Sequence, residues 1–304
     1  MASFLLRRLI LAACVAFTVL TLAFTLTRLS GDLAISIAGP SATQADVAAI
    51  RTAYGLDRPL PQQFLAWVGR AAVGDFGESY FFKSRVSTLI AERMPITLTL
   101  GLVGLAIALT VSIPLGILAA VRENTWVDRL VQLFAMIGQA MPSFWLGLIA
   151  MIFFGLQLGW LPVSGTGSWE HYVMPGTVLA FSAIPALTRL TRSGMIQSLA
   201  SDYIRTARAK GLSRFSILFK HALRNAALPV VSIASVQLGF MLGGSIVIET
   251  VFALHGVGFL AWESITKNDF PVVQAVVLVL AVIYVGLTLL ADLFNAVLDP
   301  RLRG

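Results

Sequence analysis

The chain has 304 residues, of which 57% are hydrophobic and only 12% are charged. Soluble domains carry roughly 25% charged residues, so a chain with a mean hydropathy of +0.84 has too little polar surface for water and is expected to lie in a membrane. A formal net charge of +7 would suit a nucleic-acid partner. The positions of the basic residues argue against such a partner, as described below.

Six stretches are long and apolar enough to cross a bilayer, which takes about 20 residues in a helix. The fourth is the shortest and contains Pro175 and Pro185. Prolines in spanning helices are tolerated where neighbouring helices satisfy the freed carbonyl groups, so we expect this helix inside the bundle. The six spans are expected near residues 9–28, 97–121, 131–156, 172–189, 229–250 and 272–293.

The Lys and Arg residues that flank these spans predict the orientation of the chain. With the N-terminus inside, fourteen of the 22 lie in cytoplasmic flanks, and only Lys267 lies in a short external segment. The remaining seven lie in or beside the long first loop, and loops of that length are translocated largely regardless of charge. Both termini are therefore predicted to be cytoplasmic. The cytoplasmic basic residues are Arg7, Arg8, Arg122, Arg129, Arg189, Arg192, Arg205, Arg208, Lys210, Arg214, Lys220, Arg224, Arg301 and Arg303.

The first span is predicted to be retained as an anchor. The apolar run between Arg8 and Ala13 is shorter than the ~7–15 residues of a signal-peptide core, and apolar sequence continues past Cys14 to Leu26. Cys14 is the only cysteine, which excludes an internal disulfide and a cysteine metal cluster.

The loop after the first span is the one sizeable segment outside the predicted membrane region. Residues 46–54 and 62–72 have helical composition, and turns are expected at 55–60 and 74–77. Two interpretations stay open, a small cap over helix ends or a docking surface for an external binding protein.

The third span contains a proline flanked by polar residues. Pro142 should kink the helix, and Gln139 and Ser143 beside it could line a translocation path. Alternatively, Gln139 hydrogen-bonds to a neighbouring helix.

The segment from Ser201 to Pro229 is the longest polar interruption in the C-terminal half. Its first part predicts a short amphipathic helix that ends at Gly211, because glycine tolerates the backbone angles of a turn. A second amphipathic helix, from Phe215 to Leu228, is expected to stop at Pro229, which cannot donate a backbone hydrogen bond. A helix, turn and helix at the membrane face would suit insertion into a groove on another protein.

The fifth span carries small and polar residues. Gly239 and Gly243 are spaced for close helix packing, whereas Gln237 could face a central pathway. Glu249, near the outer end, could pair with a basic group of the long loop or meet a substrate amine, since ionisable groups within a span usually face protein or water.

Several chemistries find no support in the sequence. No Gly-x-x-x-x-Gly-Lys-Ser/Thr loop is present, and His171, His221 and His255 have no metal-ligand spacing. The sequence offers no defensible catalytic triad or carboxylate pair. We expect neither a cofactor nor catalysis in this chain.

The polar segment resembles the cytoplasmic loop of ABC-importer permeases, whose pattern is Glu-Ala-Ala, three residues, Gly and later Leu-Pro. Here Arg205-Thr206-Ala207 replace Glu-Ala-Ala, Gly211 is the glycine, and Leu228-Pro229 arrives several residues late. Both departures are similar to the dipeptide, oligopeptide and nickel permease branch, as are the loop patterns GLDRPLxxQF and GDFGxS.

The resemblance covers nearly the whole chain and implies an all-α integral membrane protein with the six-helix type I ABC-importer permease fold in the bacterial inner membrane. It implies an N-terminal helix (1–28), a periplasmic loop region (29–96) and a five-helix core (97–304) with a coupling loop at 190–228. Implied partners are a second homologous permease, two cytosolic ATPases that bind ATP and Mg, and a periplasmic or lipid-anchored binding protein. The residues expected to contact the ATPase are Tyr203, Arg205, Thr206, Ala207, Arg208, Lys210, Gly211 and Leu212.

Other functions remain as alternatives. The expected substrates are dipeptides or short oligopeptides, and glutathione, nickel chelates and opine-like compounds are used in the same branch. A stand-alone carrier driven by an ion gradient would place ionisable residues near the bilayer midplane, but the candidate charges lie at helix ends. A nucleic-acid-binding role is disfavoured because basic cytoplasmic loops already have a topological cause.

Overall fold

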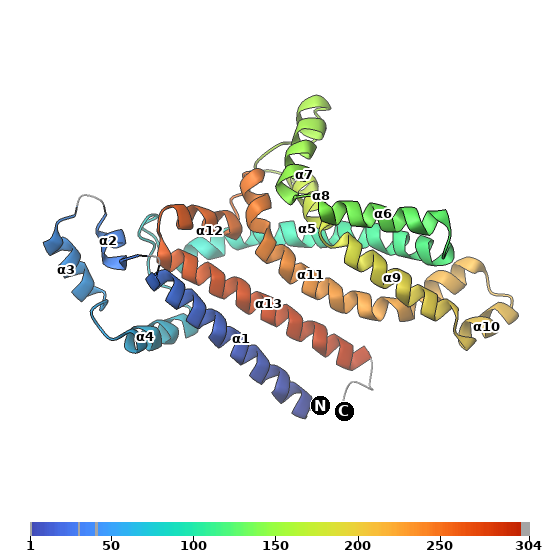
Figure 1. The fold of residues 1–304 in the computed structure, drawn as a ribbon, viewed down its shortest axis with the longest axis horizontal. Coiled ribbons are helices and arrows are strands. Elements are labelled where there is room, and N and C mark those ends of the chain that lie inside the picture. Colours follow the sequence, from blue (N-terminus) through green and yellow to red (C-terminus); the bar gives the residue numbers. More distant parts are fainter. Residues whose placement is uncertain (1, 30, 40–41, 299–304) are drawn as a thin grey trace. The chain divides into compact units, whose positions relative to one another are not determined.

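The structure, a computed structural model, describes residues 2–29, 31–39 and 42–298, so the expected cytoplasmic Arg301 and Arg303 lie outside this part. Within it the chain forms helices, turns and one isolated β-bridge between Glu78 and Arg85 (Figure 1). Residue contacts divide the chain into two compact units. Unit 1 comprises Leu98–Leu254 and the segment from Gly286, and unit 2 comprises Ala2–Thr97 and His255–Val285.

Unit 2 contains the first helix and the helices of the long loop. The predicted loop helices are confirmed, and a capping box, in which the Asp46 amide donates to the Thr43 hydroxyl and the Thr43 amide to the Asp46 carboxylate, starts α3. The Thr43 hydroxyl also donates to the Asp46 carboxylate at 2.7 Å, and this bond, together with the one from the Thr43 amide, holds the pKa of Asp46 below its usual range. The short helix α2 was not predicted from the sequence. The helices are α1 (Ala2–Leu29), α2 (Leu33–Ala38), α3 (Gln44–Ala53), α4 (Leu60–Ala72) and α12 (Val257–Thr266), with the beginnings of α5 (Val86–Val121) and α13 (Phe270–Leu298).

A buried carboxylate joins the end of the long loop to the start of α13. Asp269 accepts hydrogen bonds from the Ser79 hydroxyl and, at 3.2 Å each, from the amides of Tyr80 and Phe81. The Ser79 oxygen in turn accepts the Phe82 amide at 2.8 Å. Asp269 and Ser79 are both buried, and these internal hydrogen bonds replace the hydrogen bonds to water that the polar groups lose on burial. The loop at 79–82 is therefore an ordered part of unit 2.

Unit 1 holds the remaining helices. Figure 1 shows α9 running along α11, with α10 in the chain segment that joins them. Two π-helical stretches, η1 and η3, adjoin α7 and α11. The elements are α6 (Trp126–Ala140), α7 (Ser143–Ala150), η1 (Met151–Gln157), the 3-10 turn η2 (Trp169–Tyr172), α8 (Val173–Phe181), α9 (Ile184–Leu199), α10 (Asp202–Ala209), η3 (Ser216–Ala222) and α11 (Leu223–Val251).

The described helices provide four candidate spans, or six, as predicted, if each of two bent helix pairs counts as one span. Four stretches are long and apolar enough to cross a membrane alone, namely Leu6–Leu29, Val86–Val121, Ser216–Val251 and Phe270–Leu293. Two bent pairs qualify when each is one span: α6 with α7 and η1, bent by 99°, and η2 and α8 with α9, bent by 60°. The bend at Pro142 is the one that the sequence predicted, and the second bend lies beside Pro185, for which no bend was predicted.

Glycines let the helices of unit 1 approach closely. A Cβ at Gly116 would lie 2.5 Å from the Thr191 Cβ, and one at Gly194 would lie 3.1 Å from the Ala226 backbone. Among the expected pair, Gly239 is buried, whereas a Cβ at Gly243 would meet nothing within 4 Å. The spacing alone could not show which glycines face a neighbouring helix.

The prediction that a helix stops at Pro229 is wrong. Pro229 lies inside α11, which continues to Val251. Proline removes one amide donor, but a break here would expose several backbone groups of a spanning segment, and each unsatisfied group in lipid costs several kcal/mol. The helix therefore continues through the proline.

Candidate functional site

The short helix α10 has one buried face and one charged face. Ile204 is fully buried and Ala207 is 6% exposed, whereas Arg205, Thr206 and Arg208 are exposed. Arg205 and Asp202 form an ion pair at 2.5 Å, but both are open to solvent, so the pair adds little stability. The helix thus offers basic groups outward while its apolar side holds it to the protein.

An apolar cluster fastens α10 to α5, to α9 and to the continuous helical segment of η3 and α11. Ile204 and Ala207 pack with Ile117 and Ala120 of α5 and with Met195 of α9. Ile217, Ala222 and Ala226 of η3 and α11 complete this cluster, which we call the coupling cluster. Because close-packed side chains transmit displacement, a movement of α10 would reach α5, α9 and α11.

The turn after α10 depends on a glycine. Gly211 has a φ of +71°, and its amide donates to the Arg208 carbonyl at 3.0 Å while the Leu212 amide donates to the Ala207 carbonyl at 3.3 Å. Glycine adopts this left-handed conformation without the steric cost of a Cβ. The Ser213 hydroxyl then accepts the Ser216 amide at 3.3 Å and starts the next helix. The predicted first helix and its glycine turn are confirmed, and a second helical segment follows as expected, although it does not end at Pro229.

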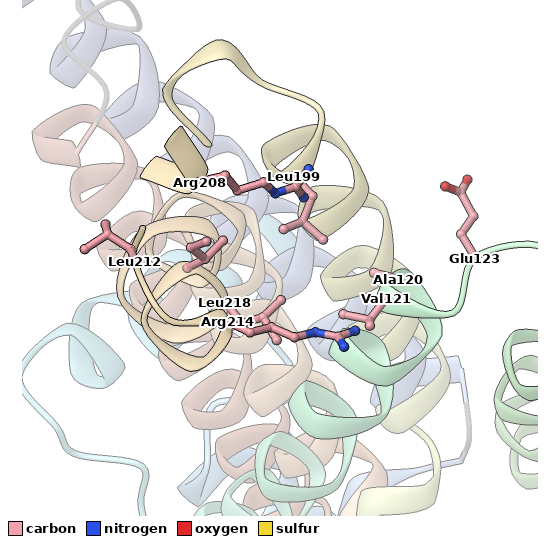
Figure 2. A pocket seen from close by; sticks show the side chains of 9 residues that line it. Ala120, Val121, Glu123, Leu199, Arg208, Leu212, Arg214 and Leu218 are labelled. Carbon is pink, nitrogen blue, oxygen red and sulfur yellow. The ribbon is translucent and has the colours of Figure 1, made fainter. Parts of the chain in front are cut away.

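A cavity of about 590 Å³ opens beside this turn (Figure 2). Its walls come from the end of α5, the end of α9 and the α10–η3 segment. Figure 2 shows Arg208 beside Leu199 and Arg214 reaching toward Ala120 and Val121. Glu123 is the one acidic residue among its described lining residues. The lining therefore combines apolar side chains with two arginines and one glutamate.

The expected contact residues differ in their accessibility. Lys210, Gly211 and Leu212 are exposed, like the charged residues of α10. Tyr203 is exposed but its hydroxyl accepts a hydrogen bond from Asn225 of α11 at 2.8 Å. Ala207 is covered by the coupling cluster, so its role is to hold α10 in place.

An ion pair near the coupling cluster was not visible in the sequence. Arg192 of α9 donates to both carboxylate oxygens of Asp128 on α6, at 2.7 and 2.6 Å. Asp128 also accepts the Asn124 amide at 3.1 Å and the Gln132 side chain at 3.3 Å. Bidentate pairs of this kind are geometrically specific, and this one joins α6 to α9. The partners are 64 residues apart, and Arg192 had been interpreted only as a topological charge.

The four expected pathway residues do not form one cluster. Gln139 and Ser143 are exposed on either side of the bend at Pro142. Gln237 is half-buried on α11, and Glu249 lies twelve residues further along the same helix, about 18 Å away along the axis and about 120° around it. Glu249 is buried and accepts the Ser245 hydroxyl at 2.8 Å.

Comparisons with known proteins agree with this architecture. The family described as "Binding-protein-dependent transport system inner membrane component" matches residues 112–304, and its N-terminal companion matches residues 1–101. Inward-facing structures of the MetNI methionine ABC transporter match with a TM-score of 0.58 and 20% identity, over 69% of this chain and 96% of theirs. That likeness concerns the fold alone.

Curated relatives match along nearly the full length. A probable peptide ABC transporter permease of Sinorhizobium fredii is 38% identical over 100% of both chains. A glutathione transport system permease of Salmonella typhimurium is 42% identical over 90% of each. A putative peptide transport system permease of Brucella abortus is 39% identical over 100% of this chain and 99% of its own.

Components of this family are multi-pass inner-membrane permeases without a cofactor, and ATP hydrolysis belongs to a separate subunit. They operate with that ATPase and with a binding protein. The match of the family over more than half of the chain, together with full-length relatives near 40% identity, shows that this protein belongs to the binding-protein-dependent transport system inner membrane components and is a non-catalytic permease subunit of an ABC importer.

Proposed function

We propose that this permease imports dipeptides or short oligopeptides. Two of the three relatives above carry names that refer to peptides, and the third refers to glutathione, which is itself a tripeptide. Nickel chelates and opine-like compounds are the remaining candidates. The proposed complex contains a second homologous permease, two ATPase subunits and a binding protein. The proposed division of the chain is an N-terminal helix (1–28), a periplasmic region (29–96) and a core (97–304).

The exposed face of α10 and the following turn form the proposed contact with the ATPase. The observation that carries this proposal is the division of α10 into an anchored side, Ile204 and Ala207, and a basic side that includes Arg205 and Arg208. A partner protein can bind the basic face of this short helix while its apolar face stays packed against three long helical segments. Only residues 200–215 lie between α9 and η3, so the coupling loop at 190–228 is helical at both ends.

In the proposed cycle, closure of the ATPase displaces α10, and the coupling cluster carries that movement into α5, α9 and α11. The Asp128–Arg192 pair extends the movement to α6, which ends at the Pro142 bend. Gln139 and Ser143 at this bend, with Gln237 and Glu249 on α11, are the proposed polar groups along the pathway. Because these residues are well separated, a substrate would contact them one after another along a path and not all at once in a single binding site.

The ATPase contact is tested with an exposed charge reversal. Arg208→Glu on α10 is compared with Arg129→Glu, an exposed arginine on α6 that does not line the cavity. Each tagged permease is purified from native membranes in mild detergent, and bound ATPase is quantified by mass spectrometry. We expect about a tenfold loss of ATPase with Arg208→Glu, since a like charge placed at a complementary interface weakens association. Equal recovery with both variants would contradict the proposed contact.

The substrate is tested separately in proteoliposomes that contain the complete transporter and its binding protein. Uptake of a labelled dipeptide is measured with unlabelled dipeptide, glutathione or a nickel chelate as competitor. We expect the dipeptide to compete best. Glutathione-selective uptake would overturn the dipeptide assignment and leave the ATPase contact unaffected.

A further inference from the structure

A second cavity lies within unit 2. It has a volume of about 320 Å³ and lies between the end of α1, the turn before α4, α4 itself and the 76–80 loop. Cavities of this size can hold a small ligand or the polar head of a larger one. Its lining contains three guanidinium groups, Arg28, Arg58 and Arg70, against one carboxylate, Glu78. The balance of charge therefore favours an anion.

One of these arginines has a buried donor without a partner. Arg28 Nε is shielded from solvent, and no hydrogen-bond partner for it exists in the described part of the chain. The guanidinium carbon of Arg28 lies 4.9 Å from the centre of the Phe24 ring, which holds the side chain in place. A buried N–H normally has a hydrogen-bond acceptor, because a buried donor without one destabilises the protein. An acceptor supplied by a ligand would remove this free-energy penalty.

Tyr80 adds a neutral polar group to the same lining. Burial, reinforced by nearby Tyr54 and Asp269, raises the pKa of Tyr80 to about 12, so its hydroxyl stays protonated at neutral pH. The Tyr54 and Tyr80 rings meet edge to face, with centroids 6.2 Å apart. The lining thus joins guanidinium groups to a hydroxyl donor, and both suit phosphate oxygens.

An apolar groove of about 410 Å³ adjoins this cavity and shares Phe24 and Arg28 with it. It runs between α1 and α4, and Phe17, Leu60 and Phe64 contribute to its walls. The Phe64 ring packs edge to face on Phe24 at 5.4 Å and on Phe17 at 6.1 Å. Arg28 therefore lies where the apolar groove along α1 meets the cationic cavity.

We propose that this combined site binds one anionic phospholipid, with its phosphate on Arg28, Arg58 and Arg70 and an acyl chain in the groove between α1 and α4. Arg28 lies in the last turn of α1, a candidate membrane span, where phospholipid headgroups meet the protein. The neighbouring Trp67, whose ring centroid lies 6.2 Å from that of Phe24, is an interfacial residue type that fits this depth.

The occupant follows from the two halves of the site taken together. A free phosphate or a peptide carboxylate would satisfy the arginines but would leave the apolar groove open to water or lipid. A phospholipid covers both halves because its charge and its chain are covalently joined. The proposal requires only that the chain is embedded in a membrane and is independent of the transported substrate.

The test uses the purified complete transporter, stripped of endogenous lipid and reconstituted with phosphatidylglycerol that carries a photoreactive acyl chain. After illumination, crosslinked peptides are quantified by mass spectrometry. We expect labelling of the facing segments 17–29 and 60–70. Arg28→Gln should reduce this labelling about tenfold, since it removes a charged donor from the phosphate. Arg58→Gln, which changes an exposed side chain and carries less risk for folding, should reduce it several-fold.

Arg85→Gln is the matched control, because Arg85 is an exposed arginine of the same loop that does not line either cavity. Every variant must still co-purify with its ATPase. Two competitors separate the possible sources of phosphate: inorganic phosphate and water-soluble glycerophosphoglycerol. Failure of both to displace the lipid supports the proposal. Displacement by inorganic phosphate at concentrations similar to the lipid would overturn it, as would equal labelling in Arg28→Gln and Arg85→Gln.

Discussion

Two segments of this chain are held to their units by different forces. The helix α10 is fastened by the apolar coupling cluster around Ile204 and Ala207. The loop at 79–82 is fastened by one buried carboxylate, Asp269, which accepts a hydroxyl and two amides. Apolar contacts are non-directional and leave α10 free to shift with its neighbours as a body. Hydrogen bonds to a buried charge are directional, so they hold the loop in a defined geometry. The coupling element thus has the attachment that tolerates movement.

Removing the carboxylate should have the largest effect. Asp269→Ala would leave the Ser79 hydroxyl and the Tyr80 and Phe81 amides without their acceptor in a buried site, at a cost of about 4 kcal/mol. Hydrogen exchange in the intact complex should rise by orders of magnitude at residues 79–82 and remain unchanged in α10. Asp57→Asn, an exposed carboxylate of the same loop, is the control. Unchanged exchange at the loop would mean that other contacts hold it.

Truncating the apolar anchor of α10 should come next. Ile204→Ala removes buried methyl groups from the coupling cluster and should cost about 3 kcal/mol. We expect binding-protein-stimulated ATPase activity to fall because α10 no longer moves with α5 and α9. Ala209→Ser, an exposed change on the same helix, should keep full stimulation. If Ile204→Ala also kept full stimulation, the coupling cluster would not carry the movement.

The Asp128–Arg192 pair should have a smaller effect that can be assigned by a double-mutant cycle. Asp128→Asn alone leaves Arg192 without its charged partner and should lower stability by about 2 kcal/mol. Arg192→Gln should lower the free energy of unfolding less in the Asp128→Asn background than in the wild type. The difference between the two losses, the coupling energy measured by thermal unfolding, should be about 1–2 kcal/mol. Strict additivity of the two changes would show that the pair does not join α6 to α9.

The smallest effect is expected at the turn. Gly211→Ala should cost about 1 kcal/mol through its left-handed backbone alone, because a Cβ there would meet nothing within 4 Å. The control is Gly69→Ala in α4, where the space is equally open and the backbone is helical, so stability should rise slightly. Equal effects at the two positions in thermal unfolding would contradict the strain at Gly211.

Local sequence patterns predicted local features well. The two main loop helices, the α10 helix with its glycine turn and the bend at Pro142 all depend on neighbouring residues and appeared where expected. Pro229 shows the limit of such rules. Pro142 follows Met141, whose ψ of 131° is extended, whereas Pro229 lies within a continuous helix. Proline favours an extended preceding residue, but the need to pair the backbone of a spanning helix can outweigh that preference.

The sequence by itself determined that this protein spans a membrane, which segments do so, and that residues 201–212 form a basic helix and turn, because apolar length and helical periodicity are local properties. The family patterns within it also determined its membership among importer permeases. Only the tertiary structure decided that Ala207 faces inward, that Arg192 pairs with Asp128, that Asp269 holds the loop at 79–82 and that Arg28 lines a cationic cavity. Each of these depends on groups distant in sequence, whose approach follows from helix packing and not from the spacing of residues along the chain.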